Sequence, residues 1–240
     1  MNLPKQINPC PIYEAVVEIR FNSSLPSDAV FGVVYNQLKD SYQNNEQLPI
    51  LQIPELVRNN DPNLKFQPYY KLKRDNYVIQ IGPHVLSLSI TDNSYTTWED
   101  YFSEIQNVFG RVGELNFISN VMRVGLRYIN FFEDDVWEKI NLSVKIVEDE
   151  ITDNEVFVRT VIPKEDFKVL LQVGNQFELT RNNQTASKVS VIDIDTSIEG
   201  DNVDFFENTE SLLNKGHKLE KEIFFKLLKE EFLASLNPQY

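Results

Sequence analysis

Charged side chains interrupt two stretches of the sequence that otherwise have the composition of buried β-strands. Residues 13–21 read YEAVVEIRF, and residues 123–132 read RVGLRYINFF. The charged residues of these stretches are Glu14, Glu18, Arg20, Arg123 and Arg127. Because side chains along a strand repeat every two residues, the first three share one face. The two later arginines also share a face, with Gly125 between them.

Two kinds of chemistry suit these side chains if the two strands lie side by side. In the first, carboxylates and guanidinium groups neutralise one another across the sheet and fix the strand register or line a groove. Removing one partner of such a buried pair costs on the order of 3–5 kcal/mol. In the second, Arg20, Arg123 and Arg127, with Lys73, hold an anionic small molecule such as a nucleotide or polyphosphate. We favour the first interpretation because structural ion pairs are commoner than ligand sites.

Metal and covalent chemistry have little support in the residue spacing. Glu14 and Glu18 would lie about 13 Å apart along a strand, too far to share one metal, whereas triphosphate-tunnel enzymes place their acids two residues apart. Asp193 and Asp195 have that closer spacing, which is also typical of a solvated strand face. The sequence contains two isolated histidines and no glycine-rich phosphate loop. We therefore expect no metal and no cofactor, and we assign no catalytic residue.

The overall composition indicates a globular protein. Of its 240 residues, 42% are hydrophobic and 25% are charged, and the net charge of −13 makes nucleic-acid binding unfavourable. No window approaches 18 consecutive apolar residues, the start of the chain lacks the pattern of a secretion signal, and one cysteine, Cys10, permits no disulfide within the chain. We expect a cytoplasmic protein without a membrane segment. Its partner would be another protein or a second copy of the chain.

Hydrophobic periodicity predicts strands and helices in the first part of the chain. A strand at 13–21 precedes a helix that opens at Pro26-Ser27-Asp28, and the proline-rich residues 48–68 should be irregular. A hairpin turning at Asp75-Asn76 and a strand at 85–91 follow. A helix with a capping box of Thr96 and Glu99 then leads to a strand around 121–132.

The second part of the chain predicts a β-meander covered by a helix. The expected strands are 141–148, 154–162, 167–173, 176–181 and 188–195. The expected turns are Asp153-Asn154, Gly174-Asn175 and Asn182-Asn183. A long amphipathic helix follows, with a kink or break at Gly216, and its apolar face should cover the meander.

The elements together predict an α+β fold. We expect antiparallel or mixed sheets, each covered on one face by helices, in two intimately packed halves at 1–134 and 135–240. One continuous domain is the alternative, because the acidic joint at 133–135 is the main sign of a boundary.

Three separated motifs resemble landmarks of a known family. NPCPIYEAVVEIRF (8–21), YTTWEDY (95–101) and RVGLRYINFF (123–132) are similar to those of a sporadically distributed family of uncharacterised bacterial proteins. Its members open with N-P-P-I-x-E-A-V-x-E-I-R-F and carry a Y-x-x-W motif and a G-L-R-Y-I-N strand. The resemblance covers mainly the first 132 residues, and Cys10 replaces a proline. The landmarks that it implies here are Glu14, Glu18, Arg20, Trp98, Arg127, Tyr128 and Asn130.

The resemblance implies no activity. Together with the charged strands, it makes a candidate polar seam, which either binds a ligand or is structural. Its residues are Glu14, Glu18, Arg20, Arg123, Arg127, Tyr128 and Asn130. The function we expect is that of a non-enzymatic binding or protein-interaction protein. The alternative is an enzyme or sensor that acts on an anionic small molecule held by the strand arginines.

Overall fold

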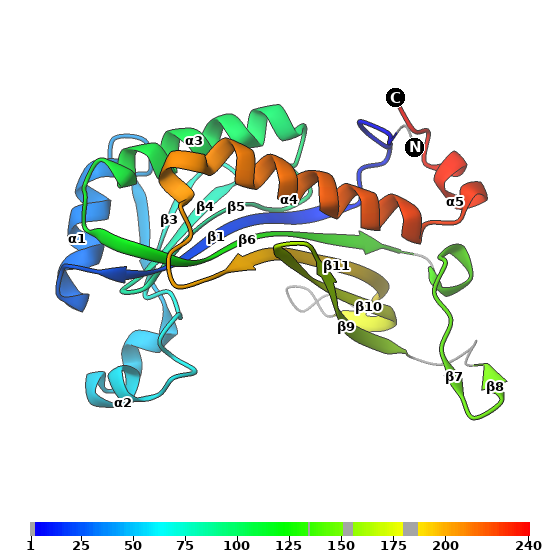
Figure 1. Cartoon of the computed structure of the whole chain (residues 1–240), viewed down its shortest axis with the longest axis horizontal. Helices are drawn as coiled ribbons and strands as arrows, with labels where there is room; N and C mark the ends of the chain where they lie inside the picture. The colour runs from blue at the N-terminus through cyan, green and yellow to red at the C-terminus, as the bar shows by residue number, and fades with distance from the viewer. Residues whose placement is uncertain (1–2, 134, 151–155, 180–186) are drawn as a thin grey trace. The chain divides into compact units, whose positions relative to one another are not determined.

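A computed structural model of the chain describes residues 3–133, 135–150, 156–179 and 187–240 (Figure 1). The chain divides by its internal contacts into two compact units. Unit 1 comprises Met1–Tyr13, Arg127–Thr196 and Asn214–Tyr240, and unit 2 comprises Glu14–Leu126 and Ser197–Leu213. Both units thus combine segments that are distant in sequence. The expected division at residue 134 stays a prediction.

The predicted α+β class is confirmed by a nine-stranded antiparallel sheet with helices in the described part of the chain. In sheet order its strands are β2 (Asn44–Gln47), β3 (Tyr70–Arg74), β4 (Tyr77–Gly82), β5 (Val85–Ile90), β1 (Ile12–Ser23), β6 (Ile118–Phe132), β11 (Ser187–Glu199), β10 (Phe167–Leu179) and β9 (Phe157–Lys164). β1 and β6 are neighbours in this order, so the two charged stretches of the sequence lie side by side.

Helices cover one face of the strands of unit 2. α1 (Ser27–Leu38) and α3 (Trp98–Gly113) lie on this side, whereas the short α2 (Glu55–Asn60) lies on the other (Figure 1). The covered face of β1 carries Ala15, Val17 and Ile19, which are completely buried. Tyr101 of α3 ties the layers together, because its hydroxyl lies 2.7 Å from the carbonyl oxygen of Leu88 and 3.1 Å from that of Ala15. The alternate residues of β1, including the charged ones, therefore face away from α3.

The start of α3 differs by one residue from the predicted cap. Thr97 is the N-cap, and its hydroxyl oxygen accepts a hydrogen bond of 3.1 Å from the backbone N–H of Asp100. Thr96, the predicted cap, instead donates its hydroxyl to the Asp100 carboxylate at 2.9 Å. Two threonines in succession, each followed three residues later by an acid, satisfy the capping pattern equally well, so the sequence could not choose between them.

The proline-rich excursion after α1 contains two short helices, η1 (Pro49–Gln52) and α2, and then returns to the end of β4. The returning chain passes so close to β4 that residue 82 has to be a glycine. A Cβ atom on that residue would lie 2.5 Å from the backbone oxygen of Gln67, closer than real contacts allow. The Arg20 guanidinium lies over the ring of Phe66, 5.0 Å from its centroid. The excursion is therefore packed against the strands near the charged face of β1.

The meander of unit 1 is covered by its own helix, as expected. α4 (Phe205–Leu227) is followed by α5 (Glu230–Ser235), and the buried Phe224 and Leu227 of α4 belong to one core with Ile192 and Ile194 of β11. The prediction of a kink or break at Gly216 is wrong. The backbone leaves helical geometry at Asn208, whereas Gly216 is buried inside a continuous helix, where a glycine costs only about 1 kcal/mol.

Two predictions for the meander strands are also wrong. Gly174-Asn175 is no turn, because β10 runs through it, and the Asn175 side-chain oxygen accepts hydrogen bonds from the backbone N–H of Val136 and the hydroxyl of Ser190. A strand at 141–148 is replaced by a two-stranded sheet of β7 (Lys145–Ile146) and β8 (Asp149–Glu150), after the short helix η2 (Trp137–Lys139). The turns at Asp153-Asn154 and Asn182-Asn183 lie outside the described residues. None of the described helices is both long and apolar enough to cross a bilayer.

Candidate functional site

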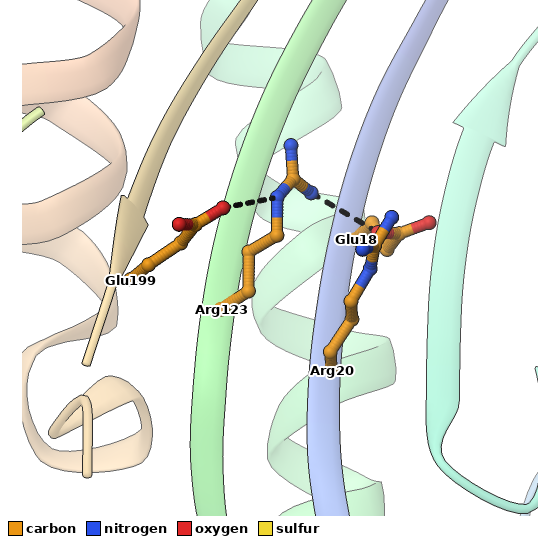
Figure 2. Close-up of polar contacts among 4 residues, drawn as sticks. All are labelled: Glu18, Arg20, Arg123 and Glu199. Atoms are coloured by element: carbon orange, nitrogen blue, oxygen red, sulfur yellow. Dashed lines mark hydrogen bonds and ion pairs between the residues drawn. The ribbon is translucent and has the colours of Figure 1, made fainter. Parts of the chain in front are cut away.

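The charged faces of β1 and β6 meet as an ion-pair group, here called the strand seam. Its members are Glu18, Arg20, Arg123 and Glu199 (Figure 2). The Glu18 carboxylate accepts a hydrogen bond of 3.0 Å from Nη1 of Arg123 and one of 2.8 Å from Nε of Arg20. Glu199 of β11 lies 3.8 Å from Nε of Arg123. One guanidinium thus bridges carboxylates from the strands on both sides of β6.

Arg123 is the most enclosed charge of the strand seam. Its side chain is 11% exposed, against 26% for Glu18 and 45% for Glu199. Figure 2 shows these side chains on the near side of the strands, with a helix passing behind. A guanidinium so poorly hydrated has to be neutralised by the protein, and two carboxylates are placed to do so. The first interpretation of the charged strands, mutual neutralisation, therefore describes Arg123.

Gly125 makes room for Arg123. A Cβ atom built on Gly125 would collide with the guanidinium of Arg123, two residues earlier on the same face. The arginine therefore lies along its own strand, across the α-carbon of the glycine, on its way to Glu18. This contact gives a physical reason for a glycine inside a strand, a position where it is normally unfavourable.

Strand register extends the polar face beyond the strand seam to the edge of unit 2. Glu18 pairs across the sheet with Ser87, and the successive register partners from there are Gln80, Lys71 and Glu46. At the edge, Glu46 forms ion pairs with Lys71 at 3.0 Å and Lys73 at 3.5 Å. The neutral Ser87 and Gln80 thus separate the strand seam from an ion-paired group at the edge, where Lys73 adds no unpaired positive charge.

A second group, in unit 1, contains the other strand arginine. Arg127 donates from Nε and Nη2 to the two carboxylate oxygens of Asp193, at 2.8 and 2.6 Å, and Nε2 of Gln172 donates to the same carboxylate at 2.7 Å. The Asp193 side chain is only 7% exposed. The expectation that Asp193 belongs to a solvated strand face is therefore wrong, because it is the buried partner of a bidentate pair.

The remaining residues predicted from the resemblance lie in other surroundings. Tyr128 and Asn130 are buried and alternate with Arg127 on β6, so they are on its opposite face. The Tyr128 hydroxyl is 3.0 Å from Nδ1 of His217, and Nδ2 of Asn130 donates to the backbone oxygen of Ile192 at 3.0 Å. Glu14 is half-buried on the strand-seam face of β1. Trp98 packs beside Tyr101 and Phe102 at the start of α3.

The structure brings forward two charged residues that sequence reasoning missed. Glu220 is completely enclosed on the apolar face of α4, and burial raises the pKa of its carboxyl group to about 8, opposed in part by the Lys221 ammonium. Its spacing, four residues before Phe224 and seven after Leu213, places it on the apolar face of the helix and could have predicted its burial. Arg58 of α2 lines a cavity, and its place in an irregular segment left no periodicity from which burial could be inferred.

The two histidines and the cysteine are partly buried, and burial shifts the pKa of each toward its neutral form. Burial, with a smaller contribution from Lys221, lowers the pKa of His217 to about 3, and burial also lowers the pKa of His84 and raises that of the Cys10 thiol. Across the described ranges, no three His, Cys, Asp or Glu side chains come together in a way that could hold a metal ion.

Comparison with known proteins adds no assignment. The chain matches no family model, and no curated protein matches it. The resemblance to the family of uncharacterised bacterial proteins stays a prediction.

Replacement of Gly125 by alanine tests the strand seam through sterics alone. The new methyl group should displace Arg123 from Glu18 and destabilise the protein by about 1–2 kcal/mol, measured by urea unfolding. Gly110, which is exposed in α3, is the control, because a methyl group added there would meet no described side chain within 4 Å. Gly110→Ala should stabilise by up to about 1 kcal/mol. A stabilising Gly125→Ala would contradict this geometry.

Glu220 predicts a pH-dependent stability. The pKa of an unfolded glutamate is about 4.3, whereas that of Glu220 in the folded protein is about 8. Between these pH values the native state binds a proton that the unfolded state has lost, so the free energy of unfolding falls as pH rises. Glu220→Gln removes this loss. Its advantage over the wild type should grow across that window and level off above it, at a few kcal/mol in order of magnitude.

Urea unfolding at several pH values measures the difference, and Glu210→Gln on the exposed face of α4 is the control. A gain for Glu220→Gln that is constant from about pH 5 to about pH 9 would show that the carboxyl group is not held protonated.

Proposed function

We propose that the protein is a non-enzymatic cytosolic binding protein that recognises another protein molecule, and that this molecule is a second copy of the chain. The observation that carries the proposal is the edge strand β9. In the sheet order it is the last strand, and among the described residues β10 is its one strand neighbour. A strand edge of this kind offers backbone N–H and C=O groups to a further strand.

One face of β9 has the side chains of an interaction surface, here called the β9 patch. Its residues are Phe157, Arg159 and Val161, which alternate along the strand. Phe157 is 58% exposed and Val161 is 52% exposed, and Arg159 between them is exposed and forms no ion pair within the described residues. Aromatic residues and arginines are enriched at protein interfaces, where they supply much of the binding energy.

A second copy of the chain fits this strand for geometric reasons. Two identical edge strands can pair antiparallel about a twofold axis, so that the same residues contribute from both sides. β9 is eight residues long, and its proline and lysine, the residues that commonly protect edges, stand at its end, at Pro163 and Lys164. The opposite edge strand, β2, has four exposed polar residues and lacks the apolar anchors.

The neutralised arginines support binding of a protein over binding of an anion by the strands. Arg123 and Arg127 each have a carboxylate within hydrogen-bond distance, and Arg20 shares Glu18. An anionic ligand held by these arginines would have to displace the carboxylates. The alternative of an enzyme or sensor that uses the strand arginines is therefore less favoured.

Sedimentation velocity of the full chain at increasing protein concentration tests the proposal. We expect a concentration-dependent dimer that Val161→Lys abolishes, because a charge would face the apolar anchors of the other copy. Leu56→Lys, at an apolar residue of α2 that is 76% exposed, is the matched control and should leave the dimer intact. Added salt should strengthen association, since each copy carries a net charge of −13. A monomer at every concentration would refute self-recognition.

A further inference from the structure

Two cavities with a common wall lie beside the proline-rich excursion of unit 2. The larger has a volume of about 410 Å³, and the smaller about 180 Å³. The residues that line both are Ser27, Arg58, Asn59, Tyr69 and Pro83. The larger volume is within the range of sites that hold small organic ligands.

Arg58 is the unusual member of this wall. Its guanidinium carbon lies 4.6 Å from the centroid of the Tyr69 ring, which supports one face of the group. Its Nε and Nη1 atoms are buried and have no hydrogen-bond partner within the part of the chain that the structure describes. A buried donor on a charged group is costly when it lacks an acceptor. The cavity wall thus carries the positive charge of Arg58, whose buried Nε and Nη1 donors no described residue satisfies.

The surroundings of the larger cavity add further attraction for an anion. Lys65 lines it and adds a second positive charge. His84 also lines it, but burial lowers the pKa of His84 and its Nδ1 donates to the backbone oxygen of Phe21 at 3.2 Å, so the ring adds no charge. Ser27, the first residue of α1, belongs to the same lining, and the preceding Pro26 gives that helix no side-chain cap. Backbone N–H groups at the start of a helix favour negative charge. The start of α1 therefore adds to the attraction that Arg58 and Lys65 exert on an anion.

Acidic residues decide which cavity can receive the anion. The smaller one is lined by Asp28 and Glu55 together with Arg58, so carboxylates outnumber the basic group there. The larger one has a single carboxylate, Asp61, against Arg58 and Lys65. The Asp61 carboxylate accepts hydrogen bonds from the backbone and side-chain N–H groups of Asn63, at 2.9 and 3.0 Å, which partly satisfies its charge.

We propose that the larger cavity is a binding site for a small organic phosphate. Arg58 and Lys65 bind the phosphate oxygens, because a guanidinium and an ammonium group are the side chains that most commonly do so. Tyr69 and Pro83 contact the organic part of the ligand. This site uses none of the strand-seam residues and none of the β9 patch, so it goes beyond the function proposed above.

Isothermal titration calorimetry of the full chain at constant ionic strength tests this site, with phenyl phosphate as the probe. Phenyl phosphate should bind, inorganic phosphate should bind more weakly because it lacks the organic part, and benzoate should bind more weakly because it has fewer acceptor oxygens. Arg58→Gln should weaken phenyl phosphate binding roughly tenfold to a hundredfold, the effect of one hydrogen-bonded charge. Lys215→Gln, which removes a positive charge at an exposed position of α4 outside the cavity, should bind as the wild type does.

The stability of the variants separates a ligand site from a structural arginine. Arg58 forms no ion pair within the described residues, so Arg58→Gln should melt close to the wild type while it loses the ligand. Should Arg58→Gln fail to fold, Lys65→Gln at an exposed position carries the same test. Wild-type protein that does not bind phenyl phosphate, variants that bind it equally well, or benzoate that binds as tightly would each overturn the proposal.

Discussion

A single largely buried guanidinium, that of Arg123, constrains the strands β1, β6 and β11 where they meet in unit 2. It joins β6 to Glu18 of β1, which is 105 residues earlier in the sequence, and approaches Glu199 of β11 as well. Because an enclosed positive charge without a carboxylate would be costly, the three strands are held in the one register that brings these groups together. The same constraint explains the glycine at position 125, because the Arg123 guanidinium occupies the space that a side chain at this position would need.

The contrast between the arginines matters for function. The strand arginines Arg123 and Arg127 are paired with carboxylates of the same chain. They therefore connect neighbouring strands and have little unneutralised charge with which to bind a ligand. Arg58, in a segment without periodicity, keeps buried donors that no described residue satisfies. The residues best suited to recognition are thus on the edge strand β9 and in the excursion, away from the motifs that carry the family resemblance.

The sequence predicted secondary structure well where the pattern of apolar and charged residues was decided locally, along a single strand. The alternation in β1 and β6 predicted both strands, and opposite charges on them predicted that they meet. Prediction failed where tertiary packing decided the outcome. Gly174-Asn175 has turn composition, yet Asn175 serves as a buried hydrogen-bond acceptor for the backbone of Val136. The burial of Glu220 and of the Arg58 donors was not predicted, because burial of a charged group depends on neighbours that are distant in sequence.

A double-mutant cycle on Glu18 and Arg123 tests the central claim most directly. Urea unfolding of Glu18→Gln, Arg123→Gln and the double variant should give a coupling free energy of about 1–2 kcal/mol, above that of an exposed pair. The exposed helical pair Glu222 and Lys226, 3.6 Å apart in α4, should give about 0.3–0.5 kcal/mol as the reference. If the effects of the two seam substitutions simply add, the ion pair does not hold β1 and β6 together, and the central claim is wrong.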